Sequence, residues 1–201
     1  MRNQQKVQWA DKLDTVMQPR EYIAFAAERI ADAAVRAWHA RKPGGISFGL
    51  SHAVAETRLP PTGWRFAADP EGVGRDRHWY RPDWNDGDWR DDVPIETSWQ
   101  NHLEQPYHGA AWYRREIELP ELPPWNRAYL IFEGVDEQAW VWVNGRFVGD
   151  HKMGPSGWNV PFRLDVTDAL TQDTVNQIAV KAANTAKAGG IWQPLVLHFF
   201  R

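Results

Sequence analysis

An acidic stretch and scattered histidines are the first residues of this sequence with metal-binding chemistry. The stretch Asp83-Trp-Asn-Asp-Gly-Asp-Trp89 places carboxylates at short spacing, and carboxylate oxygens are ligands that Ca²⁺ prefers. The helix–loop–helix calcium pattern fails, because a loop that starts at Asp83 requires glycine at position 88, where Asp88 stands. The seven histidines show no His-x-His or His-Glu-x-x-His spacing, so the sequence gives a zinc site little support.

Composition excludes several other classes of function. The chain has 201 residues, no cysteine and a formal net charge of −3, which argues against thiol chemistry and against a basic nucleic-acid surface. It contains no phosphate-binding loop. No apolar run reaches the roughly 18–20 residues that span a bilayer, and the start lacks a signal-like apolar region. We expect no membrane partner and, for the chain as it stands, a cytoplasmic location.

Thirteen tryptophans are the unusual feature of the composition. Their large, flat rings with a donor N–H suit sugar stacking as well as they suit cores. Trp140 and Trp142 alternate with Val141 and Val143, so one pair must face the core and the other the outer side. We expect the valines in the core and the tryptophans packed under a covering loop. The aromatic-dense segment 78–89 is expected to hold that long connection on the sheet, with a sugar platform as the alternative.

Two kinds of pattern divide the chain. From about residue 19 to 42, Ile23, Ile30 and Trp38 lie on one apolar stripe at helical spacing, behind Pro19 at a first-turn position. A weaker helix over 7–17 and a strand over 46–50 are further expectations. From residue 59 onward, roughly eight short alternating runs separated by turn residues predict an antiparallel sandwich. The predicted strands cover 64–68, 112–119, 128–133, 138–143, 146–150, 160–166, 177–182 and 195–200.

The predicted organisation is a helical N-terminal extension over 1–58 and a β domain over 59–201. Residues 1–58 carry an excess of basic residues, whereas residues 59–201 carry an excess of acidic ones. Asn144-Gly145 between two predicted strands indicates a type I′ hairpin, in which both positions need positive φ. The helical stripe needs a covering surface, which predicts docking on the sandwich or a homodimer through the helix.

Several segments of the β domain together resemble the sugar-binding domain of glycoside hydrolase family 2. They are Trp112-Tyr-Arg-Arg, Phe132-Glu-Gly-Val-Asp, Val141-Trp-Val-Asn-Gly-Arg-Phe-Val-Gly, Phe162-Arg-Leu-Asp-Val-Thr-Asp and Gly189-Gly-Ile-Trp-Gln-Pro, in the family's order. The resemblance implies a mainly β, galactose-binding-like jelly-roll β-sandwich over 59–201. It also implies an architectural role for the acidic stretch 83–89, with a structural calcium ion as the alternative and no other cofactor.

The resemblance directs attention to two loops, which in the family lie toward the catalytic barrel and touch substrate. Here they are 104–109, before the Trp112 strand, and 184–189, before Gly190. Tyr107, His108, Asn184 and Lys187 offer a ring, an imidazole, an amide and a cation for hydroxyl or carboxylate recognition. Exposed loop residues without a ligand are the alternative. Trp192, at the start of the last strand in the family's pattern, is the further ligand candidate, with structural packing favoured for it.

The expected function is a non-catalytic carbohydrate-binding module that takes a saccharide or polysaccharide. The family keeps its catalytic glutamates in a barrel that needs about 250 residues, and this chain has no counterpart of them, so no catalytic residue is assigned. The alternatives are a structural accessory domain or fragment of a larger glycoside hydrolase, or a small independent hydrolase that uses His108 with a nearby carboxylate.

The N-terminal part shows a second, shorter resemblance. The stretches 20–31 and 42–54 are similar to a short piece of a neutral ceramidase-like hydrolase. This piece carries none of that family's full metal site, so it transfers no zinc chemistry. It implies a different origin for the helical extension.

Overall fold

The computed structural model describes residues 19–39 and 53–201 of the chain. Contacts divide the chain into two compact units, residues 1–49 and 50–201. The first unit contains α1 (Pro19–His39), which confirms the predicted helix and places Pro19 at its first position. Arg36 and His39 lie in its last turn, where positive charge suits the helix dipole. The predicted helix over 7–17, the strand over 46–50 and the helix stop beyond residue 39 lie outside the described residues.

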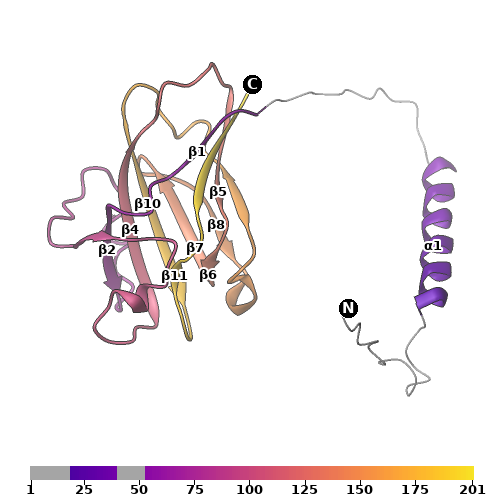
Figure 1. Ribbon diagram of the computed structural model, residues 1–201, viewed down its shortest axis with the longest axis horizontal. Helices are drawn as coiled ribbons and strands as arrows, with labels where there is room; N and C mark the ends of the chain where they lie inside the picture. The colour runs from indigo at the N-terminus through magenta and orange to yellow at the C-terminus, as the bar shows by residue number, and fades with distance from the viewer. Residues whose placement is uncertain (1–18, 40–52) are drawn as a thin grey trace, which may run out of the picture. The chain divides into compact units, whose positions relative to one another are not determined.

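The second unit is an antiparallel β-sandwich, as the sequence predicted (Figure 1). One sheet has the order β1-β12-β5-β9 and the other the order β3-β2-β4-β10-β7-β8, while β11 and β6 form a short third ladder. The first sheet consists of β1 (Ala53–Arg58), β5 (Arg127–Phe132), β9 (Phe162–Asp165) and β12 (Leu195–Phe200). The second consists of β2 (Trp64–Asp69), β3 (Arg90–Val93), β4 (Gly109–Glu118), β7 (Gln138–Val143), β8 (Arg146–Lys152) and β10 (Val175–Asn184). The short ladder joins β6 (Val135–Asp136) to β11 (Gly190–Ile191).

All eight predicted strands are present, and the sequence prediction missed β1, β3, β6 and β11. Strand β1 pairs with β12 from Ala53 to Arg58, so the sandwich starts before the predicted boundary between residues 58 and 59. The run of β1, Ala-Val-Ala-Glu-Thr-Arg, has few large apolar residues, because it is an edge strand with mostly exposed or half-buried side chains.

The core lies between the two larger sheets, and a second apolar cluster covers the outer face of the six-stranded sheet. Val141 and Val143 belong to the core, whereas Trp142 belongs to the outer cluster and Trp140 packs against it, as the alternation predicted. Trp79 from the long connection after β2 completes the outer cluster, so this connection is held on the sheet by aromatic packing.

The acidic stretch 83–89 joins this covering segment to the sheet. The Asp86 carboxylate accepts a hydrogen bond from Arg114 Nη1 at 2.7 Å and lies 3.4 Å from Arg65 Nε. Arg114 also donates to the backbone oxygens of Trp84 and Arg81. These contacts are architectural, as the resemblance implied for this stretch.

The turn between β7 and β8 has the expected conformation. Asn144 and Gly145 both have positive φ, at 51° and 78°, which is the signature of a type I′ turn. A Cβ on Gly145 would lie 3.0 Å from Pro82 Cδ, a tight contact that Pro82 would have to relieve. The described part of the chain contains no helix with the length and apolar character that crossing a membrane requires.

Candidate functional site

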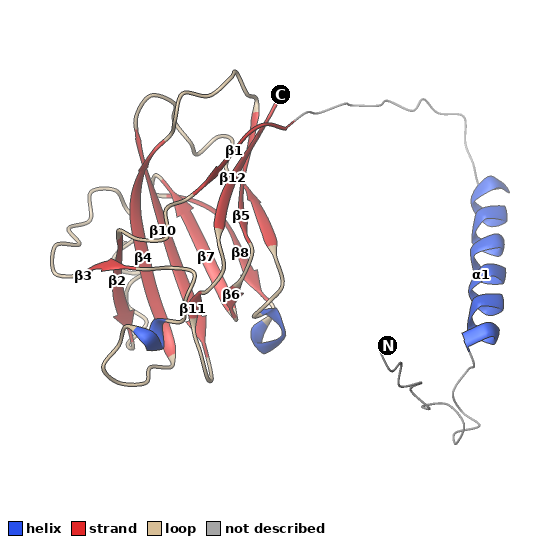
Figure 2. Ribbon diagram, in the orientation of Figure 1, coloured by secondary structure: helices blue, strands red, loops and turns tan. Residues whose placement is uncertain are grey.

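Loops and short elements from distant parts of the sequence meet at one end of the sandwich, next to β6 and β11. Two 3₁₀ helices mark this end, η1 (Trp99–Asn101) and η2 (Gly154–Gly157) (Figure 2). We call this region the loop end and define it as residues 96–109, 133–137, 154–158 and 184–192. It contains every ligand candidate predicted from the sequence.

Gln100 ties the two predicted loops together. Its side-chain nitrogen donates to the backbone oxygens of Tyr107, at 2.9 Å, and Lys187, at 2.7 Å. Its side-chain oxygen accepts from Gly189 N at 2.9 Å. One amide thereby fixes loops that are separated by about eighty residues of sequence, and it uses both ends of the side chain to do so.

His108 and Asn184, two of the predicted ligand candidates, lie next to each other across these loops. His108 Nδ1 lies 3.3 Å from Asn184 Oδ1. Asn184 is buried, and its amide nitrogen donates to the backbone oxygens of Ala186 and Ala188, which shapes its own loop. His108 is exposed, and in residues 53–201 it has no carboxylate within hydrogen-bond distance. The imidazole is therefore an exposed group of the loop end whose hydrogen-bond partner is an amide and not a carboxylate.

Tyr107 and Lys187 have different surroundings. The Tyr107 hydroxyl donates to Ala110 O at 2.5 Å, its ring packs near Trp99, and burial raises the pKa of the phenol. Tyr107 thus stabilises its own loop, because its hydroxyl hydrogen is already used in the bond to Ala110 O and is not available to a ligand. Lys187 is exposed with φ of 62°, a left-handed conformation that turns loop 184–189 sharply.

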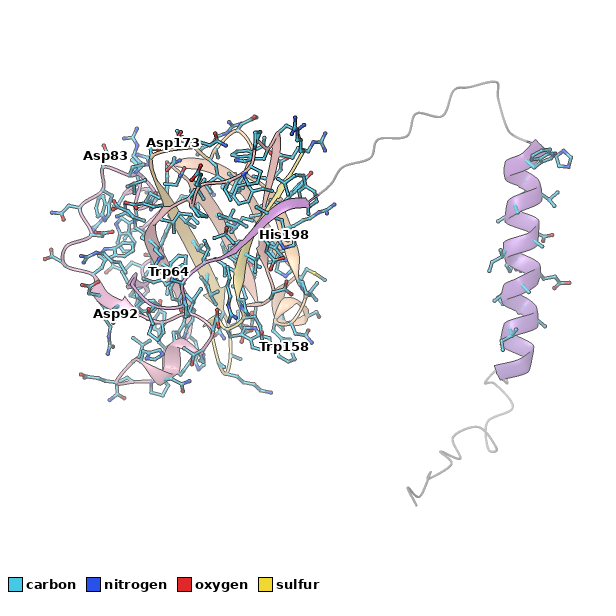
Figure 3. All side chains as sticks on the ribbon, turned by 45° about the horizontal axis from the view of Figure 1, so that its top comes forward. Trp64, Asp83, Asp92, Trp158, Asp173 and His198 are labelled. Carbon is cyan, nitrogen blue, oxygen red and sulfur yellow. The ribbon has the colours of Figure 1, made fainter. Side chains whose placement is uncertain are left out.

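Trp192 lies between β11 and β12, and the last strand begins at Leu195, as predicted from the run 195–200, and not at Trp192 as in the family's pattern. Its ring stacks on Trp158 with centroids 5.3 Å apart and planes at 27°, and its Nε1 donates to Trp158 O at 2.6 Å. Gly157, just before Trp158, has no room for a Cβ, which would approach Glu137 O to 2.8 Å. Trp158 itself is 48% exposed and lies at the edge of the sandwich (Figure 3).

Two adjacent carboxylates lie at the loop end, Asp136 at the end of β6 and Glu137 directly after it. Glu137 is buried and accepts hydrogen bonds from Thr185 Oγ1 at 2.9 and 3.0 Å. Asp136 is half-buried, and its burial, followed by the nearby charge of Glu137, raises the pKa of its carboxyl. A hydrogen bond with the Asn184 side chain acts in the opposite direction. Asp136 and Asn184 thereby belong to one hydrogen-bonded cluster of side chains.

A pocket with a volume of about 260 Å³ opens beside the tryptophan pair. Its lining comes from four parts of the chain: Glu96, Thr97 and Ser98; Asp136; Trp158; and Ala188, Gly189 and Trp192. We call it the Trp158–Trp192 pocket. Indole rings and polar groups converge there, which is the usual make-up of a small-molecule site.

The residues that the structure describes show no arrangement of side chains typical of a metal site. Within residues 19–39 and 53–201, no three His, Asp or Glu side chains are arranged to hold a metal ion, and this includes the acidic stretch 83–89.

Sequence reasoning missed Asp136, Trp158 and Gln100. Asp136 stands in the segment Phe132-Glu-Gly-Val-Asp that carries part of the family resemblance, and this was the signal that could have drawn attention to it. Trp158 follows Gly-Pro-Ser-Gly, a run without strand or helix periodicity, and Gln100 lies in a 3₁₀ turn. Only the fold brings these residues together.

The fold is an antiparallel β-sandwich with a pocket at its loop end. A sequence profile described as glycosyl hydrolases family 2, sugar binding domain, matches residues 61–192. The chain therefore belongs to this family.

Similar proteins carry names from the same family. The chain is 38% identical over 79 residues to a β-galactosidase of Thermoanaerobacter pseudethanolicus, a match of 39% of this chain and 10% of that protein. It is 28% identical over 136 residues to a β-glucuronidase of Paenibacillus borealis, covering 66% of this chain and 21% of that protein. These matches give no support to the ceramidase-like resemblance of the segment 20–54.

Solved structures share the fold. The β-glucuronidase of Ruminococcus gnavus in complex with D-glucuronic acid superposes with a TM-score of 0.62 at 19% sequence identity, over 78% of this chain and 31% of that one. The chain thus spans less than a third of the length of these relatives.

Proposed function

We propose that this chain is a non-catalytic carbohydrate-binding domain that takes its saccharide at the loop end. The observation that carries the proposal is the Trp158–Trp192 pocket, where an aromatic pair stands beside the Asp136 carboxylate. Apolar faces of a sugar ring pack on indole, and hydroxyl groups donate to carboxylate oxygens. The His108 imidazole, held beside Asn184, extends the polar surface of this end.

The relatives support a glycosidase context for this binding. β-Galactosidase and β-glucuronidase are the names of the proteins that share the domain, and the chain spans only part of their length. We propose that the domain acts together with a catalytic glycosidase barrel and contributes no catalytic group of its own. His108 has the Asn184 amide, and not a carboxylate, as its partner in residues 53–201, so no observation favours an independent hydrolase.

Titration of the full chain with saccharides tests the proposal. Isothermal titration or affinity electrophoresis against galactosides, glucuronides and plant polysaccharides should show binding in the micromolar to millimolar range. Absence of binding to any saccharide at millimolar concentration would contradict a carbohydrate-binding role.

The alternative is a structural accessory domain without a ligand. Tyr107, Gln100 and Asn184 direct most of their polar groups to backbone atoms of their own loops, which is what a purely architectural loop end requires. Under this alternative, substitutions at the loop end change stability but no saccharide titration gives a signal.

Helix α1 is proposed as a contact element, with the sandwich or a second copy of the helix as its partner. Ile23 and Ile30 are 66% and 70% exposed, and burying such side chains is worth roughly 1.5–3 kcal/mol each. Deleting residues 1–45 should lower solubility or change the mass measured by light scattering. A truncated protein with unchanged mass, solubility and stability would show that the helix is a passive appendage.

A further inference from the structure

The Trp158–Trp192 pocket has the size and lining of a site for one sugar ring. Its volume of about 260 Å³ lies just below the roughly 300–1,000 Å³ of pockets for drug-sized ligands. Trp192 uses its indole N–H on Trp158 O, so the pair offers ring surface to a ligand and not that donor. Stacking between the two rings leaves Trp158 about half exposed, which keeps an apolar surface available to the C–H groups of a sugar.

Three residues with oxygen acceptors join the largely apolar lining of the pocket. Asp136 has a carboxylate, and Thr97 and Ser98 have hydroxyl groups. Thr97 Oγ1 accepts from Asn101 at 2.9 Å, and Ser98 Oγ accepts from Gln100 N at 3.3 Å, so both hydroxyls are held in place by η1. Fixed acceptors beside an aromatic surface are suited to a ring that carries several O–H donors.

The charge of the pocket is negative. Glu96 and Asp136 line it, and Glu137 lies close enough to Asp136 to influence its titration. One guanidinium, that of Arg58, is bound to Glu96 by two hydrogen bonds. Because Arg58 pairs with Glu96, the excess negative charge of the lining is carried by Asp136, which has no ion pair among the residues that the structure describes and lies where it would face the carboxylate of an anionic ligand.

We propose that the Trp158–Trp192 pocket binds one uncharged pyranose ring and rejects the carboxylate of a uronic acid. This inference rests on the proposed function, since it names the sugar class for the same loop end. The uncharged ligand proposed here differs from the glucuronide that the name β-glucuronidase of several relatives would suggest. Like-charge juxtaposition is a common way in which a binding site excludes a close analogue.

The decisive experiment compares two sugars that differ only at carbon 6. The full chain, labelled with ¹⁵N, is titrated with methyl β-D-glucopyranoside and with methyl β-D-glucuronide, and the indole and backbone N–H signals of the loop end are followed by NMR. We expect shifts confined to residues around the pocket and an affinity for the glucuronide that is about tenfold lower. Raising the salt concentration should narrow the difference, because the repulsion is electrostatic.

Variants assign the effect to the pocket. Trp158→Ala should weaken glucoside binding about tenfold, and Phe147→Ala, an aromatic residue of similar exposure on β8, should not change it. Asp136→Asn should raise the affinity for the glucuronide relative to the glucoside. Asp173→Asn is its control, because Asp173 lies away from the pocket and asparagine tolerates its positive φ of 57° (Figure 3).

The outcomes separate this inference from the proposed function. The inference fails if the glucuronide binds as tightly as the glucoside, or if binding survives Trp158→Ala. The proposed carbohydrate-binding function would stand in either case. If no saccharide binds, the polysaccharides included, both the inference and the proposed function are overturned. Tighter glucoside binding that is lost in Trp158→Ala and made less selective by Asp136→Asn supports the inference.

Discussion

Trp112 with Trp142 and Trp158 with Trp192 are two stacked pairs of nearly the same geometry in different surroundings. The rings of the first pair lie 5.1 Å apart at 28°, and those of the second 5.3 Å apart at 27°. On the outer face of the six-stranded sheet, however, Trp112 is fully buried and Trp142 is 4% exposed, whereas Trp158 at the loop end is 48% exposed.

The difference lies in what covers the rings. Trp112 gives its Nε1 hydrogen to Asp69 at 2.9 Å, and Trp79 packs against it from the long connection after β2. The loop-end pair is instead open on one side and stands next to Asp136. A high tryptophan content therefore does not locate a sugar site, because ring pairs of equal geometry serve as packing in one place and as available surface in another.

The largest expected effect distinguishes the two pairs by stability. Trp112→Ala should lower the free energy of unfolding by about 3–5 kcal/mol, because it leaves a large cavity and removes the partner of Asp69. Trp158→Ala should change it by no more than about 0.5 kcal/mol. Urea unfolding followed by circular dichroism measures both values. Equal losses would mean that the exposed pair is structural after all.

Gly145→Val tests the end of the sandwich opposite the loop end, at the turn after β7. Valine resists the φ of 78°, and its Cβ would approach Pro82 Cδ to 3.0 Å. We expect a loss on the order of 1–3 kcal/mol in unfolding free energy, as for strained backbone positions, with saccharide affinity unchanged. Gly145→Asn is the control, since asparagine tolerates positive φ and should cost less. A Val variant with an unchanged melting temperature would argue against a strained turn.

The hairpin end of the sandwich could be predicted from the sequence better than the loop end. The hairpin at Asn144-Gly145 and the alternation of Trp142 with Val143 are local signals, and the structure confirmed both. The loops containing His108 and Asn184 were found through the resemblance to a family. The ladder between β6 and β11 consists of two-residue strands, too short to show any period. Asp136 and Trp158 meet only through long-range packing, which no local pattern encodes.

Gln100→Ala tests whether the loop end is assembled by one side chain. The variant loses the hydrogen bonds to Tyr107 O, Lys187 O and Gly189 N, which should lower the unfolding free energy by about 1–2 kcal/mol. Saccharide affinity should fall as well, because both loops lose their common anchor. Gln105→Ala, at an exposed position of the same loop end, should leave both quantities nearly unchanged. Affinity that survives the loss of Gln100 would place the ligand away from these loops.

The smallest expected effect concerns the charge of Asp136 and its dependence on pH. Burial raises the pKa of this carboxyl in the folded chain above its ordinary value of about 3.9. Between the unfolded and folded values the folded state holds more protons, so the contribution of Asp136 to stability is complete below pH 3.9 and is lost as the pH rises through the folded pKa. Asp136→Asn should therefore be slightly stabilising at pH 7 relative to its effect at pH 3.5.

Asp165 supplies the matched control of opposite sign. Hydrogen bonds from the side chain and backbone N–H of Thr167 hold the pKa of Asp165 below its ordinary value. Its contribution is thus present above about pH 3.9 and lost as the pH falls through the folded pKa, so Asp165→Asn should be slightly destabilising at pH 7 and neutral in acid. Urea unfolding of both variants at pH 7 and pH 3.5 gives the comparison. Changes of the same sign at pH 7 would contradict the opposite pKa directions of the two carboxyls, because they would show that folding stabilises Asp136 as an anion.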